Sequence, residues 1–582
     1  MKKRKAVLVV LVSLLLEVAI VSPLLSSIVA SQDEEEIFIM AYPSDVGEMN
    51  PLFFRSERTH WFTIQIYDSL VAYDTNLDPI PWLAESWDIS TDGKNFTFHI
   101  REGVEWHDGE SLTADDVAFT FNYMKAGPED IEEWAFLQKI VSCQATDDYT
   151  VEVAFDDPQG FGLSKLGDLE IIPKHIWDGI AHDDARWDDP NNATAHIGSG
   201  PFIFEERVPD EYISLETNEN WWGKEPNVDG IRIEVIVGQS ARILAMRQGE
   251  ADTERYELWG TDVNTVIEAP ELKVVTGIVS QWDYVLGFNL TIPGLDDVSV
   301  RKAICYALDR EQIVTIARLG WGTETYSVMP ESYFPTYYNA TGKFPEQNIT
   351  YANQILDDAG YLDTDTDGIR EFPGDQTKEL SYDMMVLSWD IISVDAGAAI
   401  AEQLEEINMS VSVEITDDAV MYPALYELPR NYRAYEMSHG FSSIPDHVWD
   451  RMHSDNDIDW GNNCYGLHND TMDTALDGML HAESDAERIA KAKEIQELAT
   501  EMVPYIPLFL SDDTHAIRNE WVNYTLVPGG PFTSHNRLAM INIYSEEVVP
   551  PPAGIDWTLI VGVAVICLIV GIGGGYLMAR RR

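Results

Sequence analysis

Four acidic side chains lie at a spacing that oxygen-liganded cations use. Asp363, Asp365 and Asp367 alternate with other residues, a glycine follows, and Glu371 comes soon after. This pattern resembles the start of a calcium loop, but the twelfth position, where an EF-hand needs a bidentate Glu, is a glycine. Two alternatives therefore stay open: a structural calcium ion on these four residues, or a turn of solvated acids. Neither defines the function, and no cofactor is required.

A second group of candidate metal ligands lies between His439 and His453. His447 adds a third imidazole, and Asp446 and Asp450 stand beside it. Imidazole and carboxylate groups suit zinc, but this spacing matches no standard ligand set. We favour a polar loop beside a cleft.

Sequence motifs for catalysis are absent from the chain. H-E-x-x-H, paired C-x-x-C, G-x-S-x-G and the phosphate-binding loop do not occur. The chain has four cysteines, one of them in an apolar C-terminal segment, so no complete disulfide framework is indicated. We predict that the protein is not an enzyme.

Length and charge limit the possible partners. A chain of 582 residues is too long for one compact core and indicates two or three domains. Its formal net charge of −61 makes nucleic acid and anionic lipid surfaces poor partners. We favour a solvated acidic coat suited to salty surroundings over a cationic ligand, which would need only a local acidic pocket.

Both ends of the sequence have the composition of membrane-targeting segments. Residues 1–30 read as a secretory signal, with a basic start, an apolar run and small residues. Residues 557–579 carry no charge and are long enough to span a membrane. A Pro-rich spacer, 549–556, precedes them, and a basic tail, 580–582, favours the cytoplasmic side. We predict a single-pass cell-membrane protein with its body on the extracellular face and its C-terminus in the cytoplasm.

Helical and strand patterns alternate along the body. Residues 95–100 alternate as a strand, and 113–124 have a capping box and an apolar stripe typical of a helix. Residues 298–320 read as one long helix, and 484–502 as another. The pattern predicts an α/β protein of at least two lobes.

Five blocks of sequence occur in the order found in one known family. They are PWLAESWDISTDGKNFTFHIREGVEWHDGESLTADDVAFTFNYM, HIGSGPFIFEE with NENWWGKEPNVDGIRIEVI, VSVRKAICYALDREQIV, the opening of YANQILDDAGYLDTDTDGIREF, and CYGLHNDTMDTALDGML with the capped helix and VPYIPLF after it. Together they cover most of residues 37–545. The chain resembles the extracytoplasmic solute-binding proteins of family 5, the dipeptide, oligopeptide and nickel binders of ABC importers. The acidic coat and the C-terminal anchor suggest an archaeal cell surface.

The resemblance implies a two-lobed periplasmic-binding-protein-like α/β fold of the class II, or cluster C, type, with an extra subdomain inserted. We assign lobe I to 31–80 and 196–283, and the inserted subdomain to 81–195. Lobe II is assigned to 284–500, and the return to lobe I to 501–548. The chain then ends in the single transmembrane helix.

The resemblance also implies a receptor that captures an extracellular solute between its lobes. Such a receptor closes on its ligand and delivers it to permease subunits, and through them to ATPase subunits. A peptide is the ligand that we favour. An oligosaccharide- or metal-binding receptor of the same family, and a surface sensor or adhesion protein that reuses the fold, are the alternatives.

Position relative to the family's segments indicates candidate ligand contacts. We expect them from Tyr42, Trp61, Trp282, Trp389, Phe441 and Asp446. Peptide-binding relatives fix the ligand's amino terminus with an Asp just before a Y-x-x-P or DP element. Here Ser442, Ser443 and Ile444 stand at that place, and Asp446 comes later. Asp446 can substitute if the loop shifts; otherwise the ligand is neutral.

Overall fold

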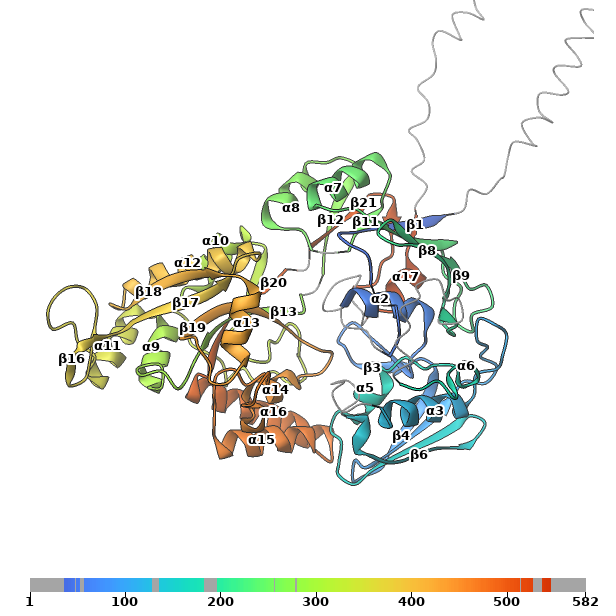
Figure 1. Cartoon of the computed structure of the whole chain (residues 1–582), viewed down its shortest axis with the longest axis horizontal. Coiled ribbons are helices and arrows are strands. Elements are labelled where there is room, and N and C mark those ends of the chain that lie inside the picture. The colour runs from blue at the N-terminus through green and yellow to red at the C-terminus, as the bar shows by residue number, and fades with distance from the viewer. Residues whose placement is uncertain are drawn as a thin grey trace, which may run out of the picture.

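The structure alternates helices and strands in two large bodies (Figure 1). It is a computed structural model that describes residues 36–47, 49–52, 57–127, 136–182, 196–255, 257–277, 280–512, 514–526 and 536–545. Each body is built around its own large sheet, and a smaller four-stranded sheet adjoins the first body. The predicted α/β class is confirmed.

The first large sheet has seven strands in the order β12-β21-β11-β1-β10-β9-β8. Their bounds are β1 Ile37–Tyr42, β8 Phe202–Val208, β9 Tyr212–Thr217, β10 Gly230–Val235, β11 Thr253–Glu254, β12 Leu272–Thr276 and β21 Thr514–Arg518. Strand β1 is parallel to both of its neighbours. Its nearly continuous apolar sequence is typical of a strand buried in a parallel arrangement. Helices that pack on this sheet are α2 Glu57–Ile66, α7 Gln239–Gln248 and α8 Gly260–Ile267. The last elements of the described chain are β22 Trp521–Val522, α17 Leu538–Asn542 and β23 Tyr544–Ser545.

The second large sheet has six strands in the order β14-β20-β13-β19-β17-β18. Their bounds are β13 Trp282–Phe288, β14 Gly322–Glu324, β17 Ser381–Leu387, β18 Ser410–Thr416, β19 Ala434–Gly440 and β20 Tyr505–Ser511. The helices of this body are α9 Val298–Ala307, α10 Arg310–Arg318, α11 Ile349–Ala359, α12 Ile391–Glu405, α13 Asp418–Tyr426, α14 His447–Met452, α15 Asp470–Leu480 and α16 Asp485–Met502. Its far end carries the hairpin of β15 Glu371–Phe372 and β16 Asp375–Glu379 (Figure 1). Strand β20 falls within the segment 501–548 that we assigned to lobe I, so the chain rejoins the first sheet only at β21.

The smaller sheet is antiparallel, in the order β4-β5-β7-β6. Its elements are β4 Ala84–Ile89, β5 Asn95–Ile100, β6 Ile140–Asp147 and β7 Thr150–Phe155, with α3 Ala114–Lys125 packed on β6 and β7. Thr113 and Asp116 form the expected capping box of α3. Short elements link this sheet to the first body: β2 Val71–Tyr73, β3 Pro79–Pro81, η1 Leu137–Lys139, α5 Gly162–Gly167 and α6 Lys174–Trp177. That these residues form an inserted subdomain stays a prediction.

The chain crosses between the large sheets twice, from β12 to β13 and from β20 to β21. The Ser280 amide donates to the Ser511 carbonyl, which ties the two crossings together. Arg318, fully buried at the end of α10, donates to the carbonyls of Leu258 and Asp512, residues that flank this junction. We call this hydrogen-bonded junction between the two crossings the hinge.

The single helix predicted over 298–320 is wrong: the chain forms α9 and α10 instead. Leu308 between them has an extended backbone. The Asp309 carboxylate then accepts a hydrogen bond from the Gln312 amide and begins a new helix. An Asp side chain can accept hydrogen bonds from backbone amides in this way and so begin a helix. The apolar spacing continues across Leu308 and Asp309, so the sequence pattern does not reveal the break.

Four predicted segments, 1–30, 549–556, 557–579 and 580–582, lie outside the described residues. Among the helices that the structure does describe, none has the length and apolar character needed to cross a membrane.

Candidate binding site

A cavity of about 550 Å³ lies between the two bodies. One wall is formed by His60 of helix α2 together with residues from η1, from α5 and from the chain just after α5. The second body contributes the loop before α14, α14 itself and the end of α15. The lining residues are His60, Phe136, Lys139, Ser164, Lys165, Asp168, Leu169, Glu170, Ser442, Ser443, Ile444, Asp446, Trp449, Asp450, Leu480 and His481. This volume is typical of small-ligand pockets, about 300–1,000 Å³.

A second cavity of about 310 Å³ shares Ser164, Ser443 and Ile444 with the first. It lies between the smaller sheet and the second body. Its aromatic lining includes Trp87, Phe96, Phe161, Tyr333, Phe334 and Tyr337. The turn at Ser443–Ile444 therefore borders both cavities.

Direct contacts join the two walls of the larger cavity. Lys165 Nζ lies 2.9 Å from Asp446 Oδ2, and Ser443 Oγ donates to the Tyr73 hydroxyl at 3.3 Å. The Gly160 amide donates to the Leu480 carbonyl at 2.7 Å. A Cβ at Gly160 would lie 2.7 Å from a carbonyl oxygen of α15, so only glycine fits there. The structure thus has the two bodies in contact on either side of the cavity.

The first body supplies a buried ion pair to the cavity wall. His60 Nε2 lies 3.3 Å from Glu170 Oε1, which also accepts a hydrogen bond from Thr63 Oγ1 at 2.9 Å. Burial acts to raise the pKa of Glu170, but His60, Arg537 and the Thr63 hydroxyl outweigh it and hold the pKa below its ordinary value. Glu170 is therefore charged and already paired.

Asp446 is held in place by the loop and helix around it. Ser442 Oγ donates to Asp446 Oδ1 at 2.9 Å. Arg451 on α14 binds Asp283, the second residue of β13, through two hydrogen bonds of 3.0 and 3.2 Å, and also donates to the Gly440 carbonyl. The buried Arg451–Asp283 pair thereby fastens the loop that carries Asp446 to the start of the strand after the hinge.

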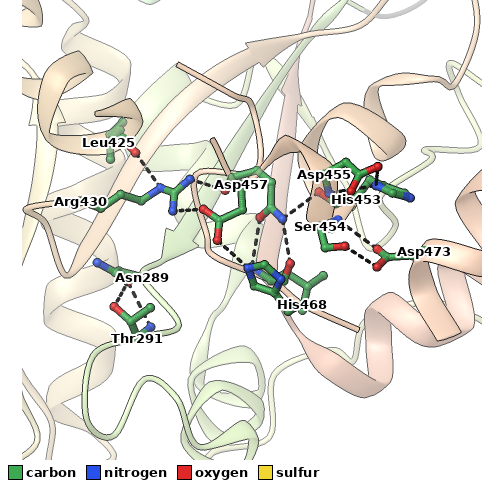
Figure 2. A network of polar contacts seen from close by, with 12 residues as sticks. Asn289, Thr291, Leu425, Arg430, His453, Ser454, Asp455, Asp457, His468 and Asp473 are labelled. Carbon is green, nitrogen blue, oxygen red and sulfur yellow. Dashed lines mark hydrogen bonds and ion pairs between the residues drawn. The ribbon is translucent and has the colours of Figure 1, made fainter. Parts of the chain in front are cut away.

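A polar network positions the chain that follows α14 (Figure 2). Asp457 pairs with Arg430, and its other oxygen lies 2.6 Å from His468 Nε2. Ser454 donates to Asp473 through both its amide and its hydroxyl. Burial acts to raise the pKa of Asp457, but His468 and Arg430 hold it below its ordinary value. The network ties this stretch of chain to α13 and α15.

The six candidate ligand contacts do not converge in the structure. Asp446 lines the larger cavity, and Phe441 packs beside it against Tyr333 and Phe334. Tyr42 and Trp61 are fully buried in the core of the first body, with their ring centroids 6.2 Å apart.

The other two candidates are exposed on the second body. Trp282 is the first residue of β13 after the hinge, and Trp389 lies between β17 and α12. That any of the six contacts ligand stays a prediction.

The three histidines of the loop do not form a metal centre. His447 Nε2 donates a hydrogen bond to the Val328 carbonyl, and its ring stacks on Phe334. His439 Nε2 lies 3.2 Å from the Tyr435 hydroxyl. Burial lowers the pKa of both imidazoles, and the nearby Arg451 lowers it further. His453 stacks on Trp449.

Three of the four predicted calcium ligands come together in the described structure. Ligand atoms of Asp363, Asp365 and Glu371 lie within 4.8 Å of one another, without Asp367 in the group. The Glu371 carboxylate accepts a hydrogen bond from the Thr364 amide, which lowers its pKa. The site lies beside β15, at the far end of the second body from the cavity (Figure 1). A structural cation here stays a prediction.

Sequence reasoning missed the charged residues on the other wall of the cavity: His60, Lys139, Lys165, Asp168 and Glu170. They come from α2, η1 and α5, which meet only after folding. No motif in the sequence marks them.

The architecture agrees with that of known binding proteins. A sequence model described as bacterial extracellular solute-binding proteins, family 5 (middle), matches residues 78–478, more than half of the chain. The chain belongs to this family. It is 28% identical over 492 residues to the oligopeptide-binding protein AppA of Bacillus subtilis (strain 168), which covers 83% of this chain and 88% of AppA.

Two solved structures extend the family comparison. AppA in complex with a nonapeptide has a TM-score of 0.69 at 25% identity, and the match covers 88% of this chain and 100% of that one. The ABC transporter substrate-binding protein CtaP of Listeria monocytogenes has a TM-score of 0.77 at 22% identity, with the same coverage. The periplasmic-binding-protein fold expected from the sequence is confirmed.

Family membership corrects one prediction. We predicted a single-pass protein of the cell membrane with a cytoplasmic C-terminus. The family is one of extracellular solute-binding proteins, and no described helix is suited to cross a membrane. These findings contradict the membrane localisation, whose basis, residues 557–579, lies outside the described residues.

Proposed function

We propose that the protein is the substrate-binding receptor of an ABC importer and that its ligand is a peptide. The observation that carries this proposal is the cavity between the two bodies, in a chain that belongs to a solute-binding family. The relative AppA is named an oligopeptide-binding protein, and its structure is known in complex with a nonapeptide. The absence of catalytic motifs agrees with binding rather than catalysis.

Ligand capture follows from the position of the cavity. A ligand that touches both walls gains contacts only when the bodies approach, so it favours the closed arrangement. The hinge allows this because two chain crossings join the bodies. The Lys165–Asp446 ion pair shows that charged groups of the two walls come within 2.9 Å when the walls meet.

The partners of this receptor are permease subunits and, through them, ATPase subunits. The closed receptor presents both bodies to a permease at once, whereas an open one does not. This property lets a permease distinguish loaded from empty receptor.

Mass spectrometry of small molecules that co-purify with the full-length protein tests the proposal. We expect a mixture of peptides, released on unfolding. Isothermal titration calorimetry with the recovered peptides should give saturable binding, and small-angle scattering should show a smaller radius of gyration on binding. Recovery of only sugars or metal ions, with no calorimetric response to any peptide, would refute the peptide ligand.

A further inference from the structure

Asparagine sequons are more frequent in this chain than chance predicts. Eight of its 24 asparagines stand in the pattern N-x-Ser/Thr, in which the side-chain amide nitrogen can accept a glycan. Serine and threonine make up about one residue in nine, so chance would produce about three such patterns. The eight sequons begin at Asn95, Asn192, Asn289, Asn339, Asn348, Asn408, Asn469 and Asn523. Asn192 lies outside the described residues.

Two of the sequons are buried and have their amide nitrogens engaged. Asn289 is 1% exposed, and its Nδ2 donates to the Tyr432 carbonyl at 3.0 Å. Asn339 is 7% exposed, and its Nδ2 donates both to the Lys493 carbonyl and to Glu497 Oε1. A glycan on either nitrogen would displace these hydrogen bonds and the side chains packed around them. The fold therefore excludes a glycan at these two positions.

Asn348 is exposed, and its amide nitrogen is not engaged. It is the N-cap of α11, where its Oδ1 accepts a hydrogen bond from the Tyr351 amide at 3.0 Å. The cap uses only the oxygen, and within the described residues Nδ2 has no hydrogen-bond partner. Thr350, the third residue of the sequon, is also exposed. A glycan on Nδ2 would extend into solvent and leave the cap intact.

Asn95 is exposed on the outer face of the smaller sheet. It is the first residue of β5, in which alternate side chains point to the same face. Asn95 and Thr97 therefore lie on the face opposite the buried Phe96 and Phe98. The Asn95 Nδ2 donates to Ser90 Oγ at 3.4 Å, a long and therefore weak hydrogen bond. Little holds this amide nitrogen back from modification.

The other three described sequons are less suited. Asn408 and Asn523 each donate from Nδ2 to a backbone carbonyl, that of Gly368 and that of Asn542 respectively. Asn469 is half-buried at the start of α15. These three therefore rank behind the sequons on α11 and β5.

We propose that the exported protein carries N-linked glycans at Asn95 and Asn348. The family consists of extracellular proteins, and residues 1–30 read as a secretory signal. The co-reactant is an oligosaccharide linked through phosphate to a lipid, and a membrane transferase of the host catalyses the step. The asparagine Nδ2 attacks the anomeric carbon, so a C–N bond forms and the C–O bond to the phosphate breaks. Nδ2 loses one proton, and the lipid phosphate leaves with the bonding electrons.

These glycans would lie apart from the proposed peptide site. Asn95 and Asn348 are outside the linings of both cavities. Helix α11 lies toward the end of the second body that is far from the first body (Figure 1). The inference thus goes beyond the proposed function, and peptide binding is expected with or without the glycans.

Peptide mapping by mass spectrometry tests the proposal on the full-length protein purified from its own organism. The peptides that contain Asn95 and Asn348 should carry glycan mass, whereas those with Asn289 and Asn339 should be unmodified. Thr350→Ala should remove the glycan from Asn348 alone, because the sequon needs a hydroxyl at its third position, and Thr350→Ser should keep it. This pair of variants leaves the cap of α11 in place, which Asn348→Gln would not.

An unmodified peptide at Asn95 or at Asn348 would overturn the assignment of that site. Glycan mass at Asn289 or Asn339 would overturn the argument from burial, and a glycan kept at Asn348 in Thr350→Ala would overturn its dependence on the sequon. Calorimetric titration of the same protein with peptides is a separate measurement. A failure there would refute the proposed function and leave the glycans standing.

Discussion

Glu436 provides the sharpest test of how the second body is held together. It lies on β19, at the centre of the six-stranded sheet, with no exposed surface. Neither carboxyl oxygen has a hydrogen-bond partner within the described structure. Burial raises the pKa of Glu436 well above its ordinary value, the neighbouring Asp390 raises it further, and the Ser393 hydroxyl offsets only part of this rise. The side chain is therefore protonated in the folded protein at pH values where it is charged in the unfolded chain.

The sign of the pH dependence follows from this difference. Above the ordinary glutamate pKa the unfolded chain releases the proton and the folded protein keeps it, so stability falls as pH rises until the folded pKa is reached. The loss is about 1.4 kcal/mol for each pH unit. Glu436→Gln cannot ionise and removes this loss, so its stability relative to wild type should increase as pH rises above the ordinary glutamate pKa, by at most about 1.4 kcal/mol for each pH unit.

Urea unfolding of both proteins at several pH values, followed by tryptophan fluorescence, measures this difference. Comparing variant with wild type cancels the repulsion within this highly acidic chain, which both share. Glu414→Gln, at an exposed position on the edge strand β18 of the same sheet, is the matched control and should follow wild type at every pH. A stability difference for Glu436→Gln that does not change with pH would refute the reasoning.

Three further results are expected. Arg451→Met should lower the free energy of unfolding by about 3–5 kcal/mol, because it leaves the Asp283 carboxylate buried and unpaired. The double variant with Asp283→Leu should recover much of that loss, and denaturant unfolding measures both effects. Lys165→Met removes the ion pair to Asp446, and because this pair is partly exposed, the free energy of unfolding should change by less than about 1 kcal/mol. Small-angle scattering of the empty variant should show a larger radius of gyration than that of wild type. An unchanged radius would mean that the pair does not hold the walls together. Calcium at a hundredfold excess over its Kd should raise the free energy of unfolding of wild type by about 2.7 kcal/mol and that of Glu371→Gln by less. If calcium changes the stability of neither protein, the turn of solvated acids is favoured.

Local sequence patterns predicted the elements that depend on neighbouring residues. The capping box of α3 and the alternation of β5 are visible in the sequence because each involves residues only a few positions apart. The break between α9 and α10 was missed because Asp309 can equally sit within a helix or begin one. Its capping role depends on the extended backbone of Leu308, which packing decides.

The cavity could not be read from the sequence in the same way. Asp446 was found because it lies near a family element, but the aromatic candidates Tyr42 and Trp61 proved to be core residues. A Trp or Tyr that fills a core has the same local sequence as one that stacks on a ligand. Lys139 and Asp168 were not singled out, because they come to line one cavity only after the chain has folded.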